Sequence, residues 1–136
     1  MRAIRPRDLE LSPAWYDNDQ HARWRSASAL GAGVGAQASG ASVLEVPRGC
    51  RLPRHVDSAE EIVVVLAGEA EVEMDGETAR VPAGSLVLVP EGVPHEVRNA
   101  GAGPLRFAAI YAAADVTTTY ERPVEPDGAR ERGSTA

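Results

Sequence analysis

The stretch GCRLPRHVDSAEEIVVVLAG, residues 49–68, decides the fold of this chain. It begins and ends on glycine, and it carries His55, Asp57 and Glu61 just before an aliphatic run. Residues two apart on a β-strand point to the same face of a sheet, so His55 and Asp57 share a face. The pattern predicts a strand that presents metal-ligand types of side chain to the inside of a β-structure.

A second stretch, GSLVLVPEGVPHEVRN at residues 84–99, has the same character. Two prolines and a glycine predict a loop that leads into His95, and a further strand follows it. Glu61 shares the parity of the inward residues in its aliphatic run, and a buried carboxylate needs a cation as its partner. We therefore expect one divalent-metal site, with ligands His55, Asp57, Glu61 and His95.

The two stretches resemble the two signature motifs of the cupins, with Asp57 standing where the family usually has a second histidine. The resemblance covers the chain from about Val43 to Tyr111. It implies an all-β single-domain cupin, a jelly-roll β-barrel of two antiparallel sheets. It implies a function only loosely, because one barrel scaffold hosts many unrelated activities.

The aspartate leaves three arrangements open. If Asp57 binds the ion, two imidazoles and two carboxylates form a hard ligand set that favours Fe, Mn or Zn over Cu(I). If its short side chain does not reach, then His55, Glu61 and His95 bind, and Asp57 is a candidate base beside the ion. A barrel that has lost its metal, with His55 and Asp57 simply paired, is the third arrangement. Asp57 and Glu61 are the candidates for a catalytic role.

The expected function is that of a metal-dependent enzyme acting on a small organic molecule in the barrel mouth. In the family, the same site performs oxygen-dependent cleavage, isomerisation, lyase chemistry and the cyclisation of polyketide chains. A compact or aromatic substrate would suit the apolar pocket that the sequence predicts. That pocket is lined by Val63, Val65, Val72, Val87 and Phe107.

Two other interpretations remain. The first is a non-catalytic cupin module that holds a metal or a ligand for sensing or storage. The second is a dioxygenase that uses iron and 2-oxoglutarate, which the pattern His55-Val56-Asp57 with His95 and Arg106 superficially resembles. The glycines fit the cupin pattern better, and the gap between Asp57 and His95 is short for that dioxygenase family.

The composition of the chain limits its domain count, its partners and its location. A chain of 136 residues is the size of one domain. Its 14 basic residues are all arginine and its net charge is −6, so no basic surface would attract a nucleic acid. The aliphatic run at 62–67 is too short to span a bilayer, and the amino terminus lacks the apolar stretch of a signal peptide. The single cysteine, Cys50, cannot form an internal disulfide, which indicates a reduced, cytoplasmic location.

The chain divides into three predicted parts. Residues 1–25 form an arm that packs on the barrel, residues 26–120 form the cupin barrel, and the polar residues 121–136 form a disordered tail. Within the barrel, the runs 62–66 and 86–89 are apolar on both faces. The outward face of such a strand must also be covered, by a second subunit or by the amino-terminal arm. We expect a homodimer, with Ile62, Val64 and Leu66 or their neighbours at the interface.

Overall fold

The computed structural model describes residues 1–134. Two short 3-10 helices, η1 (Pro6–Asp8) and η2 (Ala32–Val34), accompany a β-structure of 12 strands. The strands are β1 (Ser12–Tyr16), β2 (Asp19–Leu30), β3 (Gly40–Val46), β4 (Arg51–Asp57), β5 (Glu61–Ala67), β6 (Glu69–Met74), β7 (Glu77–Pro82), β8 (Leu86–Val89), β9 (His95–Asn99), β10 (Leu105–Tyr111), β11 (Val116–Val124) and β12 (Ala129–Ser134).

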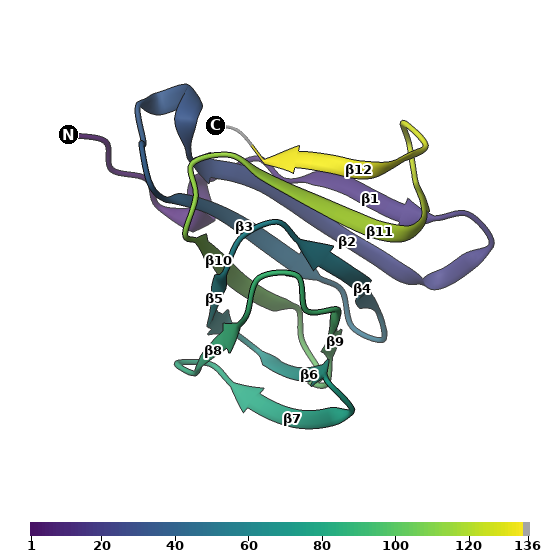
Figure 1. Cartoon of the computed structure of the whole chain (residues 1–136). Coiled ribbons are helices and arrows are strands. Elements are labelled where there is room, and N and C mark those ends of the chain that lie inside the picture. Colours follow the sequence, from purple (N-terminus) through teal and green to yellow (C-terminus); the bar gives the residue numbers. More distant parts are fainter. Residues whose placement is uncertain (135–136) are drawn as a thin grey trace.

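The strands form two antiparallel sheets that face each other (Figure 1). The first has the order β1-β2-β3-β10-β5-β8, and the second has the order β7-β6-β9-β4-β11-β12. One parallel pair, Ala22 with Arg51, joins β2 to β4 and so links the sheets at one edge. The predicted all-β jelly-roll barrel is confirmed.

Alternating residues from both sheets fill the space between them. Val63 and Val65 of β5, Phe107 of β10 and Val97 of β9 are each 1% exposed. Full burial of such a side chain stabilises the fold by about 1.5–3 kcal/mol. The core therefore holds β5, β9 and β10 firmly, and these strands carry or flank the motif residues.

Both ends of the chain differ from the prediction. The expected arm belongs to the first sheet, because β2 runs without a break across the predicted boundary at residue 25. The expected disordered tail forms the end of β11 and all of β12, while residues 135–136 lie outside the described part of the chain. Backbone pairing of β12 with β11, together with the buried Val124, offsets the polar composition of this segment.

Two turns in the chain require a left-handed backbone conformation. Asp75 and Gly76 have φ of 53° and 75°, as the tight hairpin between β6 and β7 requires. Gly68 has φ of 82°, and a Cβ atom there would lie 2.7 Å from the carbonyl oxygen of Pro104. Only glycine fits at that crossing of backbones.

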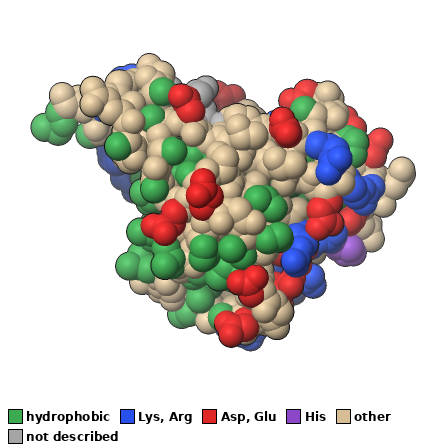
Figure 2. Space-filling view, viewed as in Figure 1, with side chains coloured by type: hydrophobic (Ala, Val, Ile, Leu, Met, Phe, Trp, Pro, Cys, Tyr) green, Lys and Arg blue, Asp and Glu red, His purple; other side chains and the backbone are tan. Residues whose placement is uncertain are grey.

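One outer surface of the first sheet is apolar and exposed. Figure 2 shows hydrophobic side chains gathered over the region of β5 and β8. Leu86 is 70% exposed and Leu88 is 56% exposed, and β8 is an edge strand of its sheet. We call this surface the outer apolar face, and it consists of Ile62, Leu66, Leu86, Leu88 and Ile110.

Within residues 1–134, no helix has the length and apolar character needed to cross a membrane.

Candidate metal centre

Four ligand-type side chains meet inside the barrel. His55 and Asp57 come from β4, Glu61 begins β5 and His95 begins β9. Their exposures are 5%, 2%, 3% and 1%, so all four are buried. Groups of this kind are removed from water only when charge or hydrogen bonding compensates them.

The donor atoms of these side chains converge. The Nε2 atom of His95 lies 3.4 Å from Oδ2 of Asp57 and 3.2 Å from Oε1 of Glu61. The Nε2 atom of His55 lies 3.7 Å from the same Asp57 oxygen. Donor atoms of His55, Asp57 and His95 all lie within 4.8 Å of one another, whereas Glu61 lies to the side of this compact group, next to His95.

A bulge in β4 aims its two ligands. The register between β4 and β9 shifts between Leu52 and His55, and the consecutive residues Leu52 and Pro53 are both buried. Proline has no N–H for the ladder and is tolerated at such a bulge. Because of the shift, Pro53, His55 and Asp57 all point inward.

Backbone carbonyls fix the orientation of both imidazoles. Nδ1 of His55 lies 2.7 Å from the Pro53 carbonyl oxygen, and Nδ1 of His95 lies 2.9 Å from that of Val93. A carbonyl only accepts, so each Nδ1 carries the proton and donates it. The Nε2 lone pair of each ring is then free to bind a metal ion, the arrangement that ligating histidines adopt in proteins.

The spacing of the donor atoms fits one ion. Two atoms that each bind the same ion at about 2.1 Å, at an angle of 90–110°, lie about 3.0–3.4 Å apart. The contacts that His95 makes with Asp57 and Glu61 fall in this range, and the His55 contact is slightly longer. In residues 1–134, the Asp57 Oδ2 and Glu61 Oε1 atoms are buried without a hydrogen-bond partner, and a bound cation would compensate both oxygens.

Electrostatics in the metal-free site favour a shared proton. Burial acts to lower the pKa of His95, but contact with the Glu61 carboxylate outweighs it and the pKa is raised. Burial raises the pKa of Glu61. His55 behaves in the opposite way, since burial and the neighbouring His95 lower its pKa to about 4. The raised pKa values of His95 and Glu61 therefore favour a proton shared by these two side chains in the metal-free site.

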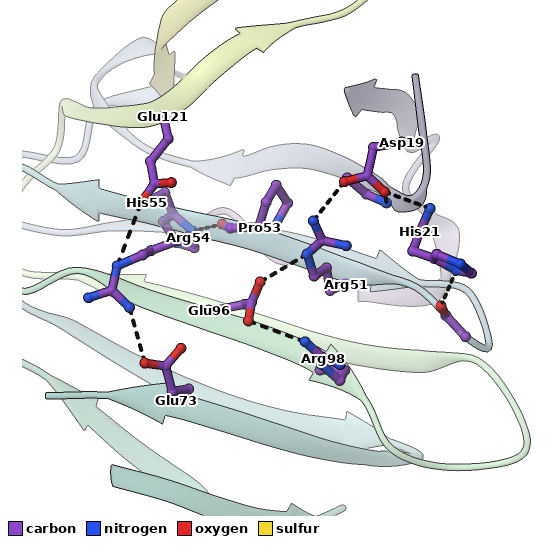
Figure 3. A network of polar contacts seen from close by, with 12 residues as sticks. Asp19, His21, Arg51, Pro53, Arg54, His55, Glu73, Glu96, Arg98 and Glu121 are labelled. Atoms are coloured by element: carbon purple, nitrogen blue, oxygen red, sulfur yellow. Dashed lines mark hydrogen bonds and ion pairs between the residues drawn. The ribbon is translucent and has the colours of Figure 1, made fainter. Parts of the chain in front are cut away.

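Ion pairs on the outer surface of β4 connect this strand to the neighbouring strands (Figure 3). Arg51 lies 2.7 Å from Asp19 of β2 and 2.9 Å from Glu96 of β9. Arg54 lies 3.1 Å from Glu73 of β6, and Glu121 of β11 lies on its other side. These partly buried contacts connect four strands to the one that carries His55 and Asp57.

A cavity of about 460 Å³ lies next to the four side chains. Three residues of its wall stand directly opposite a ligand-type residue on the neighbouring strand: Tyr111 opposite Glu61, Thr118 opposite Asp57, and Tyr120 opposite His55. Directly opposed residues have side chains in contact on one face of a sheet. The wall thus separates the cavity from the metal site by one layer of side chains.

Each wall residue interacts with the site. The Thr118 hydroxyl donates a hydrogen bond of 2.6 Å to Oδ1 of Asp57, which leaves Oδ2 directed at the histidines. The Tyr120 ring lies 5.3 Å from the His55 ring. Burial, followed by the negative charges of Glu61 and Asp57, raises the pKa of Tyr111. Its phenol is therefore neutral and able to donate.

The predicted pocket residues have other surroundings. Val63, Val65 and Phe107 pack into the hydrophobic core, and Val72 and Val87 line a separate small hollow of about 100 Å³. None of the five lines the 460 Å³ cavity. The inward parity of these residues was correct, but complementary side chains fill the space between them.

Arg106 does not belong to the site. Its guanidinium lies 3.3 Å from Glu45 and donates to the carbonyl of Pro6 on the outside of the first sheet. The similarity to the 2-oxoglutarate dioxygenases therefore ends at the His-Asp-His pattern. Cys50 is buried in the core and His21 is exposed, so neither side chain joins the four ligand-type residues.

The sequence interpretation missed Tyr111, Thr118 and Tyr120. The alternation of Val116, Thr118 and Tyr120 was a usable signal, because it places these three on one face of a strand. Nothing in the sequence indicated that this strand would pair with β4.

Comparison with known proteins supports the architecture. The family model described as "Cupin domain" matches residues 42–111. Dimethylsulfoniopropionate lyase DddQ of Ruegeria pomeroyi is 43% identical over 60 residues, which is 43% of this chain and 30% of that protein. The match therefore spans less than a third of the relative's length.

Two solved structures share the fold. The Schizosaccharomyces pombe Cnp3 cupin domain has a TM-score of 0.67 at 20% identity, covering 82% of this chain and 73% of that one. The polyketide cyclase RemF of Streptomyces resistomycificus has a TM-score of 0.64 at 20% identity, covering 82% and 78%. With a family model matched over half of its length and the barrel of two antiparallel sheets, the chain belongs to the cupin family.

Proposed function

We propose that the protein is a metal-dependent enzyme that acts on a small organic molecule bound in the 460 Å³ cavity. The observation that carries the proposal is the buried group of His55, Asp57 and His95, whose donor atoms lie within 4.8 Å of one another. If these three residues served only to maintain the fold, apolar residues of similar volume would do so with a smaller desolvation penalty. Their burial therefore favours a functional role.

In this proposal Asp57 is a ligand rather than a distant base. Its Oδ2 atom is 3.4 Å from one histidine Nε2 and 3.7 Å from the other, and Thr118 holds its second oxygen. His55, Asp57 and His95 would hold one divalent ion. Imidazole and carboxylate ligands suit Fe, Mn or Zn.

The ion would supply positive charge behind the wall of Tyr111, Thr118 and Tyr120, and its direct action as a Lewis acid on a carbonyl or carboxylate oxygen would require one of these side chains to move aside. Glu61 lies beside the ligand group and directly opposite Tyr111, whose side chain lines the cavity. We assign to Glu61 and Tyr111 the transfer of a proton between substrate and site. When a C–H bond next to a carbonyl breaks, the proton passes to this pair and the electron pair delocalises onto the carbonyl oxygen.

Among the reactions known in the family, lyase and isomerase reactions can begin with abstraction of a proton next to a carbonyl. We therefore favour these two reaction types over oxygen-dependent cleavage and polyketide cyclisation. The neutral phenols of Tyr111 and Tyr120 in the cavity wall support this choice. The partial match to a protein named as a lyase is consistent with it.

Hydrogen exchange tests the proposal without knowledge of the product. The metal-loaded protein is incubated in D₂O with a panel of small ketones, enols and carboxylates, and loss of C–H signals is followed by proton NMR. We expect exchange or turnover of at least one compound, and its absence in His95→Ala. A parent protein that holds its metal but neither exchanges nor converts any compound would favour the non-catalytic binding module.

We further infer a homodimer that buries the outer apolar face. Exposed apolar residues on an edge strand favour association with another β-edge, and a second copy offers the same surface. The single cysteine supports a reduced, cytoplasmic location.

A further inference from the structure

The 460 Å³ cavity has a lining that the substrate must match. Its floor comes from β1, β2 and β3, and its roof comes from β11 and β12. Most of the lining residues lie outside the segment 42–111 that the cupin family model matches. The side chains that a bound molecule would contact therefore come mostly from the strands that flank the matched cupin segment.

Four serine hydroxyls lie on the floor in two cross-strand pairs. Ser12 stands opposite Ser26, and Ser28 stands opposite Ser42. Among the hydrogen bonds of residues 1–134, none engages these side-chain hydroxyls. Such a row can donate to or accept from a bound molecule, and it has no evident use in holding the fold.

The only charged side chain in the described lining is Arg132 on β12. One of its terminal nitrogens, Nη1, binds Asp127 at 2.9 Å, and the remaining N–H groups of the guanidinium are available. Asp57 and Glu61 lie behind Thr118 and Tyr111, so no carboxylate side chain lines the cavity. Asp127 offsets part of the Arg132 charge, and the guanidinium N–H groups that remain favour a bound molecule with acceptor oxygens, such as an organic anion.

The middle of the cavity is aromatic. Trp24 and Tyr120 stack with centroids 5.3 Å apart and an interplanar angle of 27°, and both line the cavity. Trp24 is 2% exposed and so presents a rigid wall. A bound molecule would place a short carbon skeleton against it.

We propose that the substrate is a small organic carboxylate whose carboxylate group binds Arg132 and the serine hydroxyls, while its reactive end meets the wall of Tyr111, Thr118 and Tyr120. The guanidinium fork matches the planar carboxylate geometry. Because Asp127 already offsets part of the Arg132 charge, a singly charged carboxylate fits this position better than a doubly charged phosphate. This inference rests on the proposed function in taking the cavity as the substrate side of the metal centre.

Tryptophan fluorescence can measure binding, because Trp24 lines the cavity and the Trp15→Phe background leaves it as the only tryptophan. The probes are propionate, 3-hydroxypropionate and succinate, with propionamide and inorganic phosphate for comparison. Each is titrated into metal-loaded protein and into chelator-treated protein. We expect saturable binding of at least one carboxylate, and neither propionamide nor phosphate should match it.

The variant Arg132→Gln should weaken carboxylate binding by about 10- to 100-fold, the loss typical of a charge-assisted contact. Arg132→Lys should lose less, and both are checked for folding by circular dichroism. Arg122→Gln is the matched control, because Arg122 lies on the adjacent β11, is exposed, and donates to the backbone of Asp17 outside the cavity. It removes the same charge and should leave binding unchanged.

Three results would overturn the inference: no carboxylate binds, propionamide or phosphate binds as tightly, or Arg132→Gln binds as the parent does. Binding that disappears on chelation and is insensitive to Arg132 would mean that the metal alone recognises the carboxylate. Failure of the proposed function has a different signature. In that case carboxylates bind through Arg132 in chelator-treated protein, but the metal-loaded protein converts none of them.

Discussion

The Nε2 atom of His95 and the Oε1 atom of Glu61 lie 3.2 Å apart in the interior of the barrel. The Nδ1 atom of His95 already donates to the Val93 carbonyl, so two electron-rich atoms face each other unless a proton or a cation lies between them. Burial makes an uncompensated contact of this kind costly. The pair therefore favours a shared proton in the metal-free protein, and under the proposed function Glu61 lies beside the ion that His55, Asp57 and His95 would hold.

Metal binding should release protons as a consequence. The pKa values of His95 and Glu61 are both raised, so the metal-free site retains protons that the ion must displace. We expect affinity to fall as pH is lowered from 8.5 to 6, by about 10-fold per unit for each proton displaced. Competition titrations with a chelator of known pH dependence measure this. An affinity that stays constant over the range would contradict the shared-proton arrangement.

The change Asp57→Asn separates a ligand from a base. If Asp57 binds the ion, the loss of its charge should reduce metal affinity by at least about 10- to 100-fold. Elemental analysis and chelator competition measure the change. Asp115→Asn, at an exposed aspartate outside the site, is the control. A variant that keeps full metal content and loses turnover by about 10²- to 10⁴-fold would instead identify Asp57 as a base.

Alkaline pH should unfold the protein through its buried phenols. The protein has three tyrosines, and burial raises the pKa of Tyr16, Tyr111 and Tyr120 above the ordinary value of 10. The folded state then holds protons that the unfolded state releases, so stability is fully present below pH 10 and falls as pH rises above it. Denaturant titrations from pH 8 to 11.5 measure this loss.

The same experiment has an optical control. Tyrosinate absorbance should appear together with unfolding, and Tyr120→Phe should reduce the dependence of stability on pH. Tyrosines that ionise well before the fold is lost would show that their phenols are accessible to water.

The sequence predicted the cupin fold and the inward positions of His55, Asp57, Glu61 and His95, because fixed glycines and strand parity are local features. It did not predict the cavity. The floor comes from β1, β2 and β3 and the roof from β11 and β12, and floor and roof meet only through pairing between distant parts of the chain. The polar composition of 121–134 suggested disorder, since composition alone does not show that β12 can satisfy its backbone against β11.

The residues predicted to line an apolar pocket show the same limit of prediction from sequence. Parity correctly placed Val63 and Phe107 inward, but it could not distinguish a packed core from a cavity wall. That distinction depends on which side chains interdigitate across the two sheets.

The homodimer is tested at the edge strand. Leu86→Glu together with Leu88→Glu places charge on the outer apolar face and should convert a dimer to a monomer in sedimentation velocity at micromolar concentration. Ile4→Glu, at an exposed apolar residue remote in sequence from β8, should remain a dimer. A parent protein that sediments as a monomer would contradict the assignment, and so would a dimer that survives the double change.

The most direct test of the metal centre is elemental analysis of protein purified without added metal and again after reconstitution with Fe, Mn or Zn. We expect one divalent ion per chain in the parent, loss of that ion in His55→Ala and in His95→Ala, and retention in His21→Ala, because His21 is exposed and outside the site. The account would be contradicted by a parent that binds no ion after reconstitution, or by a His95→Ala variant that retains as much metal as His21→Ala.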